Sequence, residues 1–110
     1  MAKYEVSFNG DMETIAQRMH EGILGGSISA SFEDESYFES GNVRCLVRVY
    51  ERYSFTGGNR LSCTLTIFSD GRTVHLSAIT SGGSQAMFMK INTFGEDSFL
   101  DEVIRVARSL

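Results

Sequence analysis

The sequence predicts an α+β domain in which two helices pack on one face of an antiparallel sheet of about six strands. Three observations predict this class. Apolar and polar residues alternate with period two through the middle half of the chain, from Val43 to Asn92. Glycine-containing turns separate the alternating runs. Apolar stripes of helical period follow the first strand and close the chain, so the expected order is strand, helix, strands, helix.

The first strand and the first helix are expected within residues 3–26. Residues 4–8 alternate between apolar and polar, which predicts a short strand. Asp11 can accept a backbone hydrogen bond from a first helical turn, and Gly25-Gly26 is expected to end the helix in a left-handed conformation. One helical stripe carries the apolar residues Met12, Ile15, Ala16, Met19 and Ile23.

A serine-rich strand and an acidic loop are expected before the main sheet. Ile28, Ala30 and Phe32 alternate with serines, which predicts a second strand with one apolar side. Residues 33–42 break this alternation and are rich in carboxylates. We therefore expect an exposed acidic loop over these residues.

Four more strands are expected to follow in antiparallel hairpins. Their expected ranges are Val43–Tyr53, Leu61–Phe68, Arg72–Ser81 and Ala86–Asn92. Asp70-Gly71 predicts a type I′ turn, because both central residues of that turn need positive φ. Counting outward from the turns predicts these residues on the helix side: Val43, Cys45, Val47, Val49, Leu61, Cys63, Leu65, Ile67, Val74, Leu76, Ala78, Met87, Met89 and Ile91.

The last helix is expected to begin at Thr93, which forms a capping-box pattern with Glu96. Its apolar residues cover an arc of about 160°, which predicts a deeply seated helix. These residues are Phe99, Leu100, Val103, Ile104, Val106, Ala107 and Leu110.

The composition is that of one soluble globular domain over residues 1–110, with 42% hydrophobic and 22% charged residues. No basic-then-apolar leader and no apolar run of about 20 residues is present in the sequence, so we expect neither export nor a membrane partner. Cys45 and Cys63 are expected far apart along the β ladder. Free thiols of this kind predict a reducing, cytoplasmic location.

The face of the sheet turned away from the helices is the candidate binding surface. Its candidate residues are Arg48, Tyr50, Arg52, Phe68, His75, Ile79, Phe88 and Lys90. Three interpretations stay open: a solvated face, a homodimer that stacks or joins two sheets, and a platform for single-stranded nucleic acid. Residues 41–92 carry six basic and two acidic side chains, but the formal net charge of the chain is −4 and no RNP motif is present, which disfavours nucleic acid.

No residue pattern predicts catalysis. His75 is the only histidine expected on the sheet, but no carboxylate is placed to orient it, so we expect a polar surface residue. The run Ser81, Gly82, Gly83 and Ser84 can point backbone N–H groups at an anion, but it lacks the lysine of a P-loop. A tight turn is the simpler interpretation. The histidines and cysteines lack paired spacing, so neither a metal nor another cofactor is expected.

The leading hypothesis is a non-enzymatic homo-oligomer, most simply a dimer, that uses its open sheet face or edge for self-association or protein binding. The alternative is a small-molecule binding protein with an apolar pocket between the last helix and the sheet. Met19, Met87 and Met89 would line that pocket. An enzyme is the third class, and it would need a cleft with a perturbed acid or base.

The order of elements resembles two known architectures, the saddle-like fold of the TATA-binding protein repeat and the helix-grip fold of START-like proteins. The chain also resembles a family of short, single-domain, uncharacterised bacterial proteins, over essentially its whole length. The stretches that carry this resemblance are Val47–Ser54, Gly57–Arg60, Ile79–Ala86 and Lys90–Glu96. The resemblance implies a stand-alone bacterial protein in the cytoplasm and supplies no catalytic residues.

Overall fold

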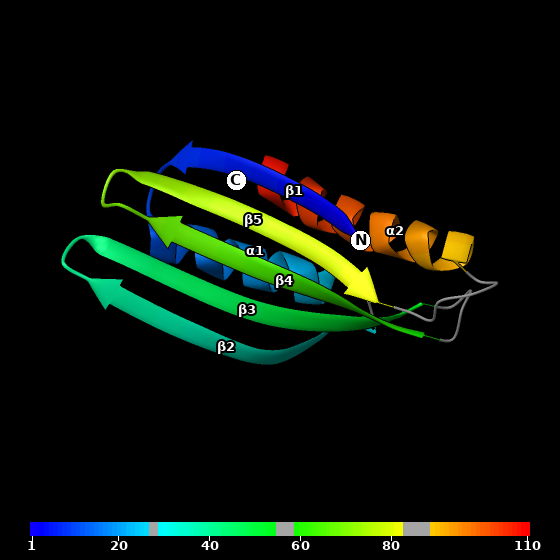
Figure 1. Cartoon of the computed structure of the whole chain (residues 1–110). Coiled ribbons are helices and arrows are strands. Elements are labelled where there is room, and N and C mark those ends of the chain that lie inside the picture. Colours follow the sequence, from blue (N-terminus) through cyan, green and yellow to red (C-terminus); the bar gives the residue numbers. More distant parts are fainter. Residues whose placement is uncertain (27–28, 55–58, 83–88) are drawn as a thin grey trace.

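The computed structural model describes residues 1–26, 29–54, 59–82 and 89–110. Five strands form one antiparallel sheet in the order β1-β5-β4-β3-β2, and α1 and α2 lie on the same face of it (Figure 1). The bounds are β1 Ala2–Asn9, α1 Met12–Gly25, β2 Ser31–Ser40, β3 Val43–Ser54, β4 Asn59–Ser69, β5 Thr73–Gly82 and α2 Met89–Arg108. The predicted α+β class and antiparallel sheet are confirmed.

Helix α1 matches its sequence pattern closely. The Asp11 side chain accepts hydrogen bonds from the backbone N–H of Thr14 at 3.0 Å and from its hydroxyl at 2.8 Å, as an N-cap should. The predicted apolar stripe is the buried face of the helix. Its end differs from the expectation, because Gly26 has φ −83° and donates its N–H to the Gly22 carbonyl without entering the left-handed region.

Helix α2 begins earlier than the sequence predicts. Met89–Asn92 form its first turn, so the expected sixth strand and the capping box at Thr93 are wrong. Residues 83–88 lie outside the described residues. A short apolar run such as residues 86–92 fits both the period of a helix and the period of a strand, and only tertiary packing decides which structure forms. The apolar arc of the helix is correct in position, since Phe99, Leu100, Val103 and Ala107 are buried.

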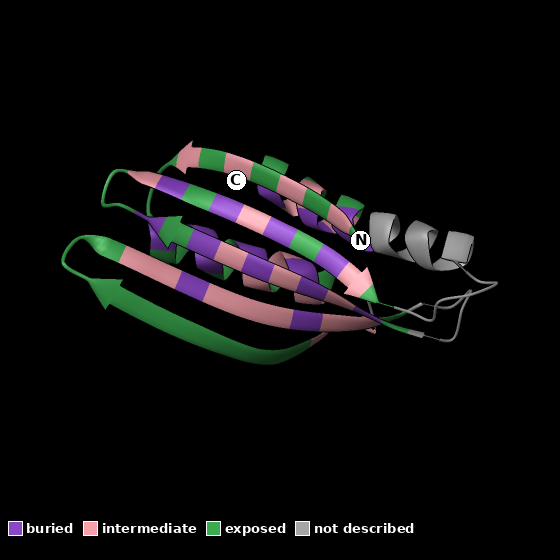
Figure 2. Cartoon of the chain, in the orientation of Figure 1, coloured by how far each residue is buried: buried purple, intermediate pink, exposed green. Residues whose placement is uncertain are grey.

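Strand β2 replaces the expected acidic loop. Residues 31–40 pair with β3 along their length, with a register shift between Phe32 and Asp34. Gly41, at φ +58°, and Asn42 then turn the chain into β3. Nine of the ten β2 residues are exposed (Figure 2). An edge strand held by backbone pairing needs no apolar alternation, which is why its sequence resembles a loop.

Strand β3 turns its faces opposite to the prediction. Cys45 pairs with Phe68, one residue away from its expected partner Ser69. A one-residue shift moves every side chain of a strand to the other face of the sheet. Leu46 and Tyr50 therefore face the helices and are buried. The residues that turn away from the helices are Val43, Cys45, Val47 and Val49.

Strands β4 and β5 keep their predicted faces. Their helix-side apolar residues are buried: Leu61, Cys63, Leu65, Ile67, Val74, Leu76 and Ala78. The register between β4 and β5 differs by two residues from the predicted one, so Phe68 pairs with His75 and not with Thr73. The Asp70 carboxylate accepts the backbone N–H groups of Arg72 and Thr73 at 2.9 Å each, which builds a wider turn than type I′.

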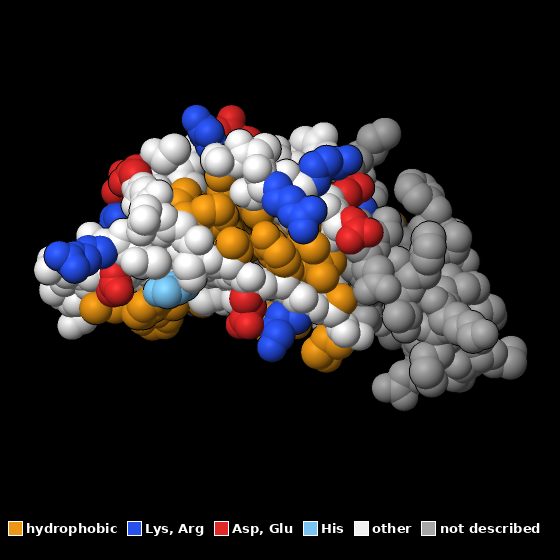
Figure 3. Space-filling view, turned by 90° about the horizontal axis from the view of Figure 1, so that it is seen from above, with side chains coloured by type: hydrophobic (Ala, Val, Ile, Leu, Met, Phe, Trp, Pro, Cys, Tyr) orange, Lys and Arg blue, Asp and Glu red, His pale blue; other side chains and the backbone are white. Residues whose placement is uncertain are grey.

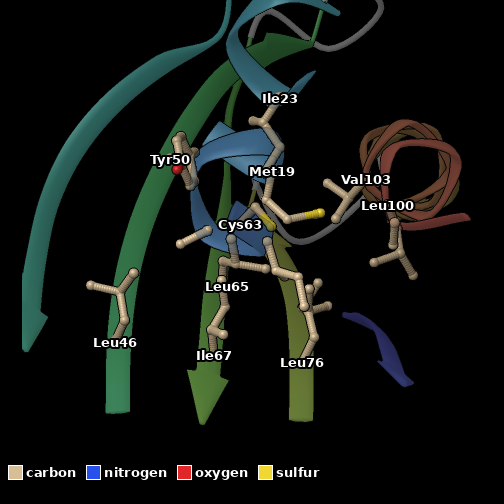
Figure 4. Close-up of a cluster of buried hydrophobic side chains, with 14 of the residues drawn as sticks. Met19, Ile23, Leu46, Tyr50, Cys63, Leu65, Ile67, Leu76, Leu100 and Val103 are labelled. Atoms are coloured by element: carbon tan, nitrogen blue, oxygen red, sulfur yellow. The ribbon is translucent and has the colours of Figure 1, made fainter. Parts of the chain in front are cut away.

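The core lies between the sheet and the two helices. Met19 and Ile23 from α1 and Val103 from α2 meet Leu65 and Leu76 of the sheet there (Figure 4). The helices touch at Gly22, where a Cβ atom would overlap the Val106 side chain. Figure 3 shows a further band of apolar side chains on the side of the molecule formed by β1 and α2. Half-buried residues that pack against the core from this side include Tyr4, Val6, Phe8, Ile104 and Leu110.

Candidate interaction surface

The sheet face opposite the helices, hereafter the open face, is built from alternate residues of all five strands. Strand register groups its central residues into cross-strand rows. Written from β2 to β1, the rows are Phe38, Cys45, Phe68, His75 and Ser7; then Ser36, Val47, Thr66, Ser77 and Glu5; then Asp34, Val49, Thr64, Ile79 and Lys3.

An apolar strip runs along β3 on the open face, one strand in from the β2 edge. It consists of Val43, Cys45, Val47 and Val49, with Phe38 and Phe68 on either side of Cys45 in its row. Ile79 of β5 lies in the row of Val49, beyond Thr64. Phe38 is 64% exposed, and Val43, Phe68 and Ile79 are each exposed by more than a third. Neither helix covers this face (Figure 1). The strip is therefore apolar surface left in contact with solvent in a single chain.

The arginines of β3 lie on the helix side, which corrects their predicted place on the open face. Arg48 donates to Glu35 at 2.9 Å and to the Ala16 carbonyl at 3.3 Å. Arg52 pairs with Glu102 of α2 at 2.9 Å, and its guanidinium lies 4.7 Å from the centroid of the Phe99 ring. These contacts hold the sheet to the helices and remove both arginines from the candidate binding surface.

Tyr50 is also a core residue and not part of the open face. Its side chain is fully buried, and its hydroxyl lies 2.8 Å from Nδ1 of His20 on α1. Phe32 of β2 completes an aromatic cluster, with its ring centroid 5.4 Å from that of His20 and 5.8 Å from that of Tyr50. Burial raises the pKa of the Tyr50 phenol, so it stays protonated and can donate.

His75 lies on the open face, as predicted. Its Nδ1 is 2.8 Å from Ser7 Oγ, and its ring centroid is 6.0 Å from that of Phe68. These residues border a shallow hollow of about 620 Å³ that Glu5, Thr66 and Ser77 also line. Among the described residues, no carboxylate forms a hydrogen bond with His75. The pair lacks the third group that would orient the imidazole for base catalysis.

Among protein-family models, that of DUF6054, a family of unknown function, matches residues 1–110. The chain belongs to the DUF6054 family. The predicted resemblance to a family of short uncharacterised proteins is thereby confirmed. No curated protein and no solved structure matches the chain, so the likeness to the TATA-binding protein and helix-grip architectures stays a prediction.

The glycine-rich run of this DUF6054 protein lies at the end of β5. Ser81 Oγ is 3.1 Å from Ser62 Oγ, and Gly82 has φ +142°. A Cβ atom on Gly82 would lie 2.7 Å from the Arg60 carbonyl oxygen, so glycine is needed for this close approach. Gly83, Ser84 and Phe88, and the side chain of Lys90, lie outside the described residues. The anion-binding interpretation of the run stays untested.

The two thiols of the DUF6054 chain lie on opposite faces of the sheet, so they cannot form a disulfide with each other. Cys63 is fully buried, and burial raises the pKa of its thiol to about 12. Cys45 is half-buried on the open face. The methionine pocket also stays a prediction, because Met19 is buried in the core while Met87 and the Met89 side chain lie outside the described residues.

The described part of the DUF6054 chain holds neither a candidate metal site nor a candidate membrane span. No group of three or more His, Cys, Asp or Glu residues is arranged there to hold a metal ion. No described helix combines the length and the apolar character that crossing a bilayer requires.

Proposed function

We propose that this DUF6054 protein is a non-enzymatic homodimer in which two copies stack their open faces. The observation that carries the proposal is the apolar strip on β3, on the face of the sheet opposite to α1 and α2. A contiguous apolar patch on one face of a small protein is typical of an interaction surface. The reversed orientation of β3 strengthens this interpretation, because it moves the three arginines of the strand to the helix side and brings three valines to the open face.

The distribution of charge supports a protein interface over a nucleic-acid platform. Between Val43 and Val49 on β3, and between Thr64 and Phe68 on β4, the open face carries no charged side chain. Charged residues of both signs stand at its margins: Lys3, Glu5, Asp34, Glu51 and Arg60. A centre depleted of charge within a polar rim is the usual anatomy of a protein interface.

The size of the open face suits a stable dimer. The sheet has five strands of 8 to 12 residues. Strands spaced about 4.8 Å apart and rising about 3.4 Å per residue give a face of about 800 Å². Specific interfaces bury about 800 Å² on each partner, so stacking the whole face would reach this size.

The cellular setting is part of the same proposal. A half-buried free thiol at Cys45, on the surface that would pair, is compatible with a reducing compartment. We therefore place the dimer in the bacterial cytoplasm.

The test is the molar mass in solution of wild type and two lysine variants, measured by size-exclusion chromatography with light scattering. Val47→Lys brings a positive charge to the centre of the strip. Tyr37→Lys brings the same charge to β2 at a residue that pairs with Leu46 on the helix side and is 47% exposed. At about 50 µM we expect a dimer for wild type and Tyr37→Lys and a folded monomer for Val47→Lys.

A wild-type monomer at that concentration would contradict the proposal, as would a Val47→Lys dimer. Far-ultraviolet circular dichroism checks that Val47→Lys remains folded. Phe68→Ser serves as a second variant of the same strip, because it removes apolar area without adding charge.

A further inference from the structure

Strand β2 forms a free edge of the sheet. It is the last strand in the order β1-β5-β4-β3-β2, and within the described part of the chain it pairs with β3 alone. Its residues are exposed almost throughout, and in Figure 2 it forms a continuous exposed band. The outer side of an edge strand presents unpaired backbone N–H and C=O groups to solvent. Below the register shift, residues 34–40 offer seven consecutive residues for pairing.

The side chains of this edge are acidic. Residues 31–40 include four carboxylates and no basic residue. Glu35 is paired with Arg48 at 2.9 Å. Asp34 accepts the Glu35 backbone N–H at 2.8 Å, and Glu39 accepts the Tyr37 hydroxyl at 2.8 Å. Among the described residues, neither Asp34 nor Glu39 has a cation within 4.0 Å, so both charges are available to a partner.

Exposed aromatic side chains stand beside these carboxylates on both faces of the edge. Tyr37 is 47% exposed on the helix side, and Phe38 is 64% exposed on the open face. Aromatic rings next to carboxylates give favourable contacts to the stems and charged ends of lysine and arginine.

We propose that β2 binds an extended, basic segment of a partner protein by adding it to the sheet as a further strand. Backbone hydrogen bonds to the free edge would supply affinity, and cross-strand pairs with Asp34 and Glu39 would select lysine and arginine. The same carboxylates repel β2 of a second copy, which keeps the edge from pairing with itself. The inference concerns the outer backbone edge of β2, which borders the open face at Asp34 and Phe38, and it does not depend on the dimer.

Asp34 lies on the open face and Glu39 on the helix side, so the two lysines of a pairing strand must stand five residues apart. The first test is binding of a fluorescein-labelled nonapeptide with two lysines at this spacing and valine or threonine elsewhere, followed by fluorescence anisotropy. A second peptide has the same charge but carries prolines that remove backbone donors and disfavour the ladder. We expect saturable binding of the first peptide and about tenfold weaker binding of the second. Slower hydrogen exchange at the amides of residues 34–40 in the complex would locate the added strand.

Matched protein variants distinguish binding at the β2 edge from non-specific attraction of a basic peptide to an acidic protein. Asp34→Asn with Glu39→Gln should weaken binding about tenfold, because two cross-strand charge pairs are lost. Glu21→Gln with Asp101→Asn removes two exposed carboxylates from the helices and should leave binding unchanged. Equal binding of both peptides, or equal binding by the edge variant and wild type, would overturn the inference. The Val47→Lys variant should bind the peptide normally, so failure of the dimer and failure of the edge site are distinguishable.

Discussion

The Tyr50 hydroxyl lies 2.8 Å from Nδ1 of His20, and this contact shows which face β3 turns to the helices. It joins the middle of β3 to α1 across the core. Because side chains alternate along a strand, placing Tyr50 inside places Val47 and Val49 outside. The proposed interaction surface therefore follows from the orientation of one strand.

Removing the Tyr50 hydroxyl tests this orientation. Tyr50→Phe keeps the buried ring but leaves His20 without its partner, so we expect the free energy of unfolding to fall by about 1 kcal/mol. Tyr53→Phe is the control, because Tyr53 is half exposed near the end of the same strand and should change stability little. Urea denaturation measures both. Equal stability of Tyr50→Phe and wild type would argue against the contact.

The contact between the helices gives a second prediction. Gly22→Ala places a methyl group against Val106, whose branched side chain has little rotamer freedom in a helix. We expect a net loss of about 1 to 2 kcal/mol in unfolding free energy by urea denaturation, despite the better helix propensity of alanine. Gly25→Ala in the same helix meets no atom within 4 Å and should be neutral or stabilising. Val106→Ala should restore part of the stability of Gly22→Ala, and a simple sum of the two losses would count against this contact.

The sequence predicted the elements that have a single apolar face. In α1 only one stripe is apolar. In β4 and β5 most positions on the open face are serine, threonine or histidine, with Phe68 and Ile79 as the apolar exceptions, so the pattern still favours one orientation of each strand. The Asp11 cap was predictable for a similar reason, since its hydrogen bond is local.

The errors arise where tertiary contacts choose between two apolar faces. In β3 both faces carry apolar residues, and the core takes Leu46 and Tyr50, which are larger than the valines, while arginine stems extend toward the helices. Strand β2 was missed because an edge strand can be acidic and exposed. The open-face residues Phe68, His75 and Ile79 were placed correctly because they lie on β4 and β5.

Alkaline pH should destabilise the fold through its buried thiol. Burial raises the pKa of Cys63 from an ordinary value of 9.0 to about 12, so the folded state holds this proton more tightly than the unfolded state. The contribution of the thiol to the free energy of unfolding is therefore complete below pH 9 and is lost as pH rises toward 12, by about 3 kcal/mol at pH 11. Tyr50, whose pKa is also raised by burial, adds a loss above pH 10.

Urea denaturation between pH 8 and pH 11 measures this effect. Cys63→Val, which keeps an apolar side chain of similar size, should flatten the alkaline decline. Cys45→Ser should leave it in place, because Cys45 lies on the open face. A decline of the same size in Cys63→Val and wild type would show that the thiol is not its source.

The most direct test of the account is the rate at which a thiol reagent labels Cys45 in dilute and in concentrated native protein. Cys45 of β3 lies in the proposed interface on the open face. Cys63 of β4 is fully buried on the helix side of the sheet. We predict that Cys45 alone is labelled in dilute protein and that its labelling slows as concentration rises and the open faces stack. Faster labelling of Cys63 than of Cys45 would contradict the orientation of β3, and a Cys45 rate independent of concentration would contradict the dimer.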